Sequence, residues 1–87
     1  MPKFFFNLRN DVSINDWEGK DLADVATARA LAIKHARGIM SEDVKDGRLV
    51  LKDEIEVVDE EGESILKLPF RDAIEIDDDP PGGEPGG

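Results

Sequence analysis

One stretch of this chain, residues 24–40, has the spacing of a long amphipathic helix, and this single helix limits the fold more than any other feature. Because the middle of its apolar side is alanine, the helix axis should lie close to the layer beneath it. Larger residues of that layer must then fill the contact, and the phenylalanines near the N-terminus are the expected source. The apolar side falls at about 100° per residue on Val25, Ala28, Ala32, Ala36 and Ile39.

Both ends of this helix carry recognisable signals. Asp24 suits the N-cap position, because its carboxylate can accept a hydrogen bond from a free N–H of the first turn. Asp21 is an alternative start, with Asp24 then three residues into the helix. We expect the helix to run past Gly38, although glycine costs about 1 kcal/mol there relative to alanine, and to end before Gly47.

Short stretches on either side of the helix alternate between apolar and polar residues, as strands do. In residues 3–9, Phe4, Phe6 and Leu8 point to one side, which we place under the helix. Residues 12–15 repeat the alternation and predict a short return strand, followed by a loop at 16–20.

After the helix, the alternation predicts two more strands, at 54–58 and 65–70, joined by an acidic turn at 59–62. Pro69 places the last strand at an edge of the sheet or near its own end, because proline donates no ladder hydrogen bond. Residues 71–76 fit either one helical turn or a further extended piece.

The resulting order is β-β-α-β-β, which predicts an α+β two-layer domain: an antiparallel sheet with one helix on one face. We assign residues 1–76 to this domain and residues 77–87, which are acidic and rich in Pro and Gly, to a disordered tail. One helix cannot cover both faces of a sheet, so Phe5 and Ile65 should lie on an uncovered face.

Composition excludes several classes of function. The 87 residues hold 21 acids, 11 bases and no cysteine, which excludes disulfides, Cys-ligated zinc and thiol chemistry. The formal charge of −10 opposes binding to nucleic acid or anionic membrane and favours cationic partners. No apolar run is long enough to cross a membrane, and the N-terminal apolar block is too short for a signal peptide. We therefore expect a cytoplasmic protein.

Three stretches are distinctive together: the opening MPKFFFNLR, the helical LADVATARALAIKHAR and the ending KLPFRDAI. Through them the sequence resembles a family of short bacterial proteins classed as a domain of unknown function. The resemblance covers nearly the whole chain apart from the tail, and Trp17 stands where an acidic residue is expected. It implies the fold and boundaries above and assigns no activity. The matching positions, beyond the Met-Pro and aromatic start, are Leu22, Asp24, Ala28, Arg29 and Ala32 in the helix, then Pro69, Phe70, Asp72 and Ala73.

The order of elements is also similar to that of HicB-like antitoxin domains, which bind and block a small basic toxin. No shared motif accompanies this second likeness, so it concerns the fold alone.

The titratable and aromatic residues have readier structural explanations than catalytic ones. His35 lies at the border of the apolar side, so we expect its ring to pack against the sheet. Arg29 should lay its stem on the core and pair with a carboxylate such as Asp72. Trp17 is expected to close the edge of the core, with an exposed anchor for a partner as the alternative. The acidic run 59–63 lacks the ligand spacing of a calcium loop.

The best candidate for a functional surface on the helix is a basic stripe of Lys34, Arg37 and Lys45. It is either a solvated face or a docking surface for an acidic protein or a second copy. We expect a non-enzymatic protein-interaction module that uses the uncovered sheet face around Phe5 and Ile65, with self-association as one mode. An antitoxin-like or regulatory partner of a basic protein is the alternative. Neither reading requires a cofactor, a metal or a small-molecule ligand.

Overall fold

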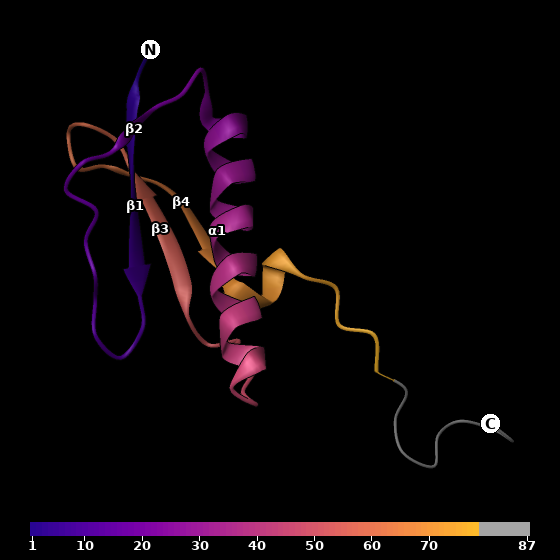
Figure 1. Cartoon of the computed structure of the whole chain (residues 1–87). Coiled ribbons are helices and arrows are strands. Elements are labelled where there is room, and N and C mark those ends of the chain that lie inside the picture. The colour runs from indigo at the N-terminus through magenta and orange to yellow at the C-terminus, as the bar shows by residue number, and fades with distance from the viewer. Residues whose placement is uncertain (79–87) are drawn as a thin grey trace, which may run out of the picture.

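The computed structural model describes residues 1–78, and these form one helix packed on one side of a four-stranded antiparallel sheet (Figure 1). The strands lie side by side in the order β2-β1-β3-β4. The predicted α+β two-layer architecture and the β-β-α-β-β order are therefore confirmed. The elements are β1 (Lys3–Arg9), β2 (Lys20–Asp21), α1 (Val25–Lys45), β3 (Glu54–Val58), β4 (Ser64–Pro69) and the 3-10 turn η1 (Phe70–Ala73).

Helix α1 begins and ends where the sequence predicts. The Asp24 side chain accepts from the Thr27 backbone N–H at 2.8 Å and from the Thr27 hydroxyl at 2.7 Å. The helix runs through Gly38 to Lys45, and Gly47 follows with a φ of 86°, a conformation that glycine adopts without strain. These local signals therefore account for both ends of the helix.

The buried side of α1 is rotated slightly from the predicted stripe. Ala28, Ala32, Ala36 and Met40 are buried, whereas Val25 is 47% exposed and Ile39 is only half-buried. The reason is the position of the helix, which packs mainly over β3, β4 and η1 and less over β1.

The bulk beneath the alanines also comes from a different place than expected. Phe70 and Val57 are the largest fully buried side chains, and both follow the helix in sequence. Among the N-terminal phenylalanines only Phe4 is buried, while Phe6 is half-buried. The prediction that β1 fills the contact with the helix is therefore wrong in part. The side of β1 that faces the helix layer is left partly open.

The second strand lies later in the chain than predicted. Residues 12–15 contribute only one bridge, between Leu8 and Ile14, and the paired strand is β2. The Asn10 side chain accepts from the Val12 backbone N–H at 2.8 Å, a local turn that competes with strand pairing. Val12 is 71% exposed as a result.

Residues 70–73 form the helical turn η1, so the start of segment 71–76 takes the helical alternative. Phe70, predicted as the end of the last strand, belongs to this turn, because β4 ends at Pro69. Phe70 N–H donates to the Asp53 carbonyl at 2.9 Å, and Arg37 Nε donates to the Ala73 carbonyl at 2.6 Å. These bonds fasten η1 to the start of β3 and to α1, which holds Phe70 in the core. Most of the predicted tail, residues 79–87, lies outside the described part of the chain.

The open space around Gly38 leads us to predict that a substitution at this position stabilises the fold. A Cβ at Gly38 meets no atom within 4 Å, and alanine is favoured over glycine inside a helix. Gly38→Ala should raise the free energy of unfolding by about 1 kcal/mol, which urea denaturation would measure. Gly19→Ala is the contrasting variant: its Cβ would lie 2.7 Å from the Phe5 ring, so it should destabilise the fold.

Candidate functional site

Residues 10–22 follow the free edge of β1 and close it. Leu8 and Ile14 exchange both backbone hydrogen bonds, at 2.8 and 2.9 Å, and Leu22 N–H donates to the Pro2 carbonyl at 3.0 Å. Between these points β2 pairs with the start of β1. An exposed strand edge invites pairing with other chains, and this connection removes that possibility on the β1 side.

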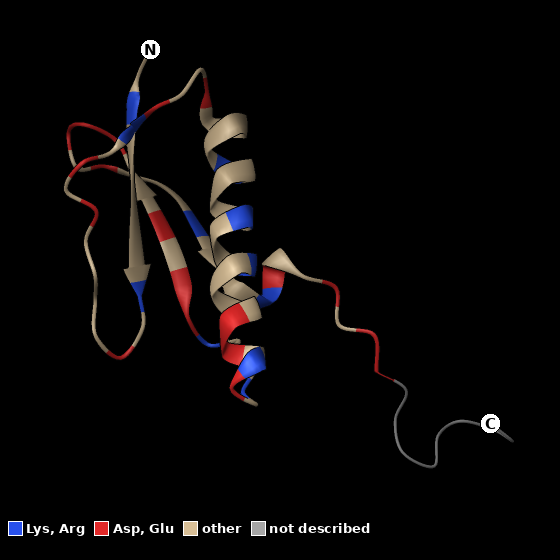
Figure 2. Cartoon of the chain, in the orientation of Figure 1, with Lys and Arg blue, Asp and Glu red and all other residues tan. Residues whose placement is uncertain are grey.

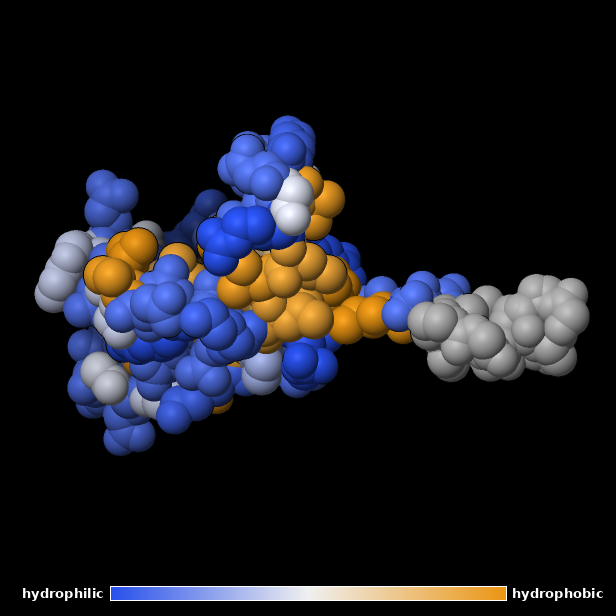
Figure 3. All heavy atoms as spheres, turned by 90° about the horizontal axis from the view of Figure 1, so that it is seen from below, coloured by the Kyte–Doolittle hydropathy of each residue, from blue (hydrophilic) through white to orange (hydrophobic). Residues whose placement is uncertain are grey.

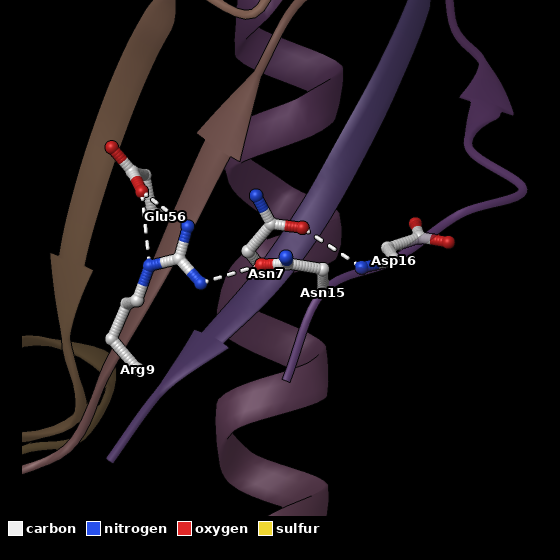
Figure 4. A network of polar contacts seen from close by, with 5 residues as sticks. All are labelled: Asn7, Arg9, Asn15, Asp16 and Glu56. Atoms are coloured by element: carbon white, nitrogen blue, oxygen red, sulfur yellow. Dashed lines mark hydrogen bonds and ion pairs between the residues drawn. The ribbon is translucent and has the colours of Figure 1, made fainter. Parts of the chain in front are cut away.

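The Asp16 side chain takes the place of a paired strand residue in the middle of this edge. Its Oδ2 accepts from the Phe6 backbone N–H at 3.2 Å. Its Oδ1 accepts from the N–H groups of Glu18 and Gly19 at 3.0 and 3.1 Å. The Asp16 N–H in turn donates to Oδ1 of the buried Asn7 at 2.8 Å (Figure 4). One residue therefore closes the edge and shapes the loop that follows.

These bonds favour the charged form of Asp16. Burial by itself raises the pKa of this carboxyl group, but the three backbone N–H groups and the nearby His35 together hold the pKa below its usual value. The loop is thus held by charge-assisted hydrogen bonds, which are stronger than neutral ones.

Trp17 is presented to solvent by this loop. Its side chain is 83% exposed, so the expectation that it closes the edge of the core is wrong, and the alternative of an exposed aromatic describes its position. The loop packs on the sheet through Gly19, whose φ of 74° and close approach to the Phe5 ring leave no room for a side chain. The loop thus contacts the outer face of the sheet through a residue without a side chain, two positions after Trp17.

The outer face of the sheet is hollowed beside Trp17. The hollow has a volume of about 520 Å³, with Phe5 and Val58 as its apolar part and Trp17 in its lining. Its polar lining includes the carboxylates of Asp16, Glu56, Asp59 and Glu60.

A hydrogen-bonded arginine crosses this face. Arg9 Nε and Nη2 lie 3.1 and 3.0 Å from Glu56 Oε1, and Arg9 Nη1 donates to Asn15 Oδ1 at 2.8 Å (Figure 4). A hydrogen bond from Ser64 and the Arg9 contact lower the pKa of Glu56, against the opposing effect of burial. Arg9 therefore ties β1 to β3 and to the loop that carries Trp17.

The other side of β1 borders an apolar groove against α1. The groove, of about 450 Å³, is lined by Phe6, Leu8, Ile39 and Ile55, with the bare backbone of Gly38 beside them. It exists because α1 is centred over β3 and β4, so that the inner side of β1 is only half covered.

His35 packs at this groove as expected. Its ring contacts Phe6 edge to face, with centroids 5.4 Å apart and an interplanar angle of 67°. Burial, Lys20 and Lys34 lower the pKa of His35, and Asp16 opposes them. The imidazole is therefore mostly neutral at pH 7.

The structure separates the residues of the predicted basic stripe. Lys34 lines the groove, whereas Arg37 points to the opposite flank and donates to Ala73. Lys45 forms an ion pair at 3.0 Å with Glu42, so the stripe is not free of acids. Figure 2 shows the basic residues spread along α1 and the acidic residues on β3, near the end of α1 and in the loops.

The two residues predicted for the uncovered sheet face are also apart. Phe5 is half-buried in the hollow beneath the loop, while Ile65 is 37% exposed at the bulge in the β3–β4 pairing. Arg29 is exposed, and the ion pairs within residues 1–78 do not join it to Asp72, contrary to expectation.

Sequence reasoning missed two features of these surfaces: the hydrogen bonds of Asp16 and the groove between β1 and α1. The Asp-x-x-Gly spacing of residues 16–19 is a turn signal that could have indicated the first.

Within residues 1–78 no helix is long and apolar enough to span a membrane. The same residues contain no group of three or more His, Cys, Asp or Glu side chains placed to hold a metal ion.

The fold and the exposed loop define a small α+β domain with an aromatic side chain presented beside an acidic sheet face. The chain belongs to the family described as Domain of unknown function (DUF6894), whose model matches residues 3–71. This confirms the resemblance noted from the sequence. No curated protein and no solved structure matches the chain.

Asp16→Asn should loosen the loop and lower stability at neutral pH. The amide keeps the size of the side chain but loses the charge and one acceptor oxygen, which should reduce the free energy of unfolding by about 1–2 kcal/mol. Because the folded-state pKa of Asp16 is lowered, its contribution is complete above about pH 4 and is lost as the pH falls through the folded-state pKa.

Chemical denaturation of both proteins at pH 7 and pH 3 would measure this dependence. The difference between wild type and Asp16→Asn should shrink at the lower pH. A difference that is equal at both values would contradict the assigned role of the carboxylate. Asp11→Asn, at an exposed ion pair with Lys52, is the matched control and should change stability little.

Proposed function

We propose that this protein acts by binding another protein and that Trp17 is the anchor of the contact. The observation that carries the proposal is a tryptophan 83% exposed on a loop held by four hydrogen bonds of Asp16. Tryptophan is over-represented among the residues that dominate interface energies. A loop that is already ordered costs less entropy when it binds.

The surroundings of Trp17 indicate the kind of surface it would contact. Asp16 and Glu18 flank it in sequence, and the hollow behind it adds the carboxylates of Glu56 and Asp59. An apolar pocket with a basic rim would complement this arrangement. The proposed contact lies on the sheet face around Phe5 that the sequence indicates, but Trp17 and not Ile65 is its centre.

A second apolar surface supports a role in association. Figure 3 shows hydrophobic atoms gathered at the end of the molecule seen from below. Val44 and Leu49, which end α1 and follow it, are 55% and 50% exposed. Apolar patches of this kind are frequent at protein contacts.

The alternative function is that of an antitoxin-like partner which neutralises a basic protein. The formal charge of −10 supports it, as does the similar order of strands and helix. In that case affinity would depend on many carboxylates and would fall steeply with salt, whereas a contact anchored by Trp17 would change less.

Trp17→Ala should remove the bound partner from a capture experiment in native lysate. Loss of an anchor tryptophan costs about 2 kcal/mol or more, so recovery at limiting concentrations should fall by a factor of about 30. Val12→Ala, at a position 71% exposed on the same connection, is the matched control and should leave recovery unchanged. Equal recovery with wild type and Trp17→Ala would refute the proposal.

A further inference from the structure

We infer that a second copy of this chain is a partner: Trp17 of one copy docks in the groove between β1 and α1 of the other. This inference rests on the proposed function, in which Trp17 is a contact anchor. It adds which surface receives Trp17: the groove of a second copy of the same chain.

The groove has the size and chemistry to receive an indole ring. Its volume is about 450 Å³, and its apolar lining is Phe6, Leu8, Ile39 and Ile55. Gly38 contributes no side chain, and the space where its Cβ would lie is open. A buried tryptophan covers about 150–250 Å² of surface, which would shield most of this lining from water.

The charges around the two surfaces are complementary. Trp17 stands between two acids, Asp16 and Glu18. The groove carries Lys34 in its lining. Two cations, Lys34 and Lys20, and one acid, Asp16, lie near enough to His35 to shift its pKa. The carboxylate in the lining, that of Glu42, is already bonded to Lys45 at 3.0 Å. An acidic loop entering this groove would therefore meet net positive charge.

The placement of the two surfaces permits reciprocal exchange. Both border β1: the Phe6 backbone N–H bonds to Asp16 in the loop, and the Phe6 side chain lines the groove. A two-fold axis beside β1 would seat each Trp17 in the other copy's groove and satisfy both sites at once.

The association should be weak and should strengthen with salt. Two indole rings and their surroundings bury less than the roughly 1,200 Å² of a standard stable interface. Each copy also carries a formal charge of −10, and this long-range repulsion is screened at about 0.15 M ionic strength.

Because Trp17 is the single tryptophan of the sequence, its fluorescence reports directly on docking. Sedimentation equilibrium between about 10 μM and 1 mM should show the mass rise towards that of a dimer. The Trp17 emission should move to shorter wavelength over the same range as the ring leaves water. A monomer with unshifted emission at about 1 mM and moderate salt would overturn the inference.

Gly38→Leu tests the groove without removing a contact. Leucine is a good helix former, and its side chain would occupy the space of the indole, so this variant should stay monomeric with solvent-exposed Trp17. Ala30→Leu, at an exposed site of the same helix outside the groove lining, is the matched control and should associate as wild type does. Thermal unfolding of both variants would check that they are folded. Association of Gly38→Leu equal to that of wild type would refute groove docking.

The two proposals fail in different ways. If self-association is absent but Trp17→Ala still abolishes capture of a different protein, self-docking is wrong and the anchoring role of Trp17 stands. If a dimer forms in both Trp17→Ala and Gly38→Leu, the dimer uses another surface and the inference is wrong. If the dimer is lost in both variants and retained in Ala30→Leu, the inference is supported.

Discussion

The close contact between the alanines of α1 and the sheet determines the rest of this structure. Ala28, Ala32 and Ala36 are fully buried, so small side chains form the centre of the contact between the helix and β3, β4 and η1. A helix about 10–12 Å wide cannot cover four strands spaced at nearly 5 Å. By settling over β3 and β4 it leaves the inner side of β1 open, and the groove is the consequence.

The edge of the sheet on that same side is closed by a different device. A full partner strand is missing beside the middle of β1, and the carboxylate of Asp16 accepts the Phe6 N–H instead. Because that carboxylate also holds Glu18 and Gly19, the bonds that close the edge also direct Trp17 outward. Structure and candidate function therefore depend on one side chain in this region.

Charge shapes how such a chain meets other molecules. The excess of acids keeps copies apart at long range, while the local distribution places Lys20 and Lys34 beside an apolar groove. Such a pattern favours contacts that are specific and reversible, because apolar burial is limited to a small area and the surrounding charges select the approach.

The sequence by itself determined the features that arise between neighbouring residues. The cap at Asp24, the end of α1 before Gly47, the order of elements and the membership of the family all follow from local spacing and turn residues. Packing His35 on Phe6 was also predictable from its place at the border of the apolar side.

Only the tertiary structure decided which strands the helix covers, where the second strand pairs and that Trp17 faces solvent. These depend on bonds between residues far apart in the chain, such as Arg37 to Ala73 and Phe70 to Asp53. They also depend on the close approach of Gly19 to the Phe5 ring, which leaves no room for a side chain there. Periodicity cannot reveal such contacts, because it assigns a residue to a face of its own element and not to a neighbour in space.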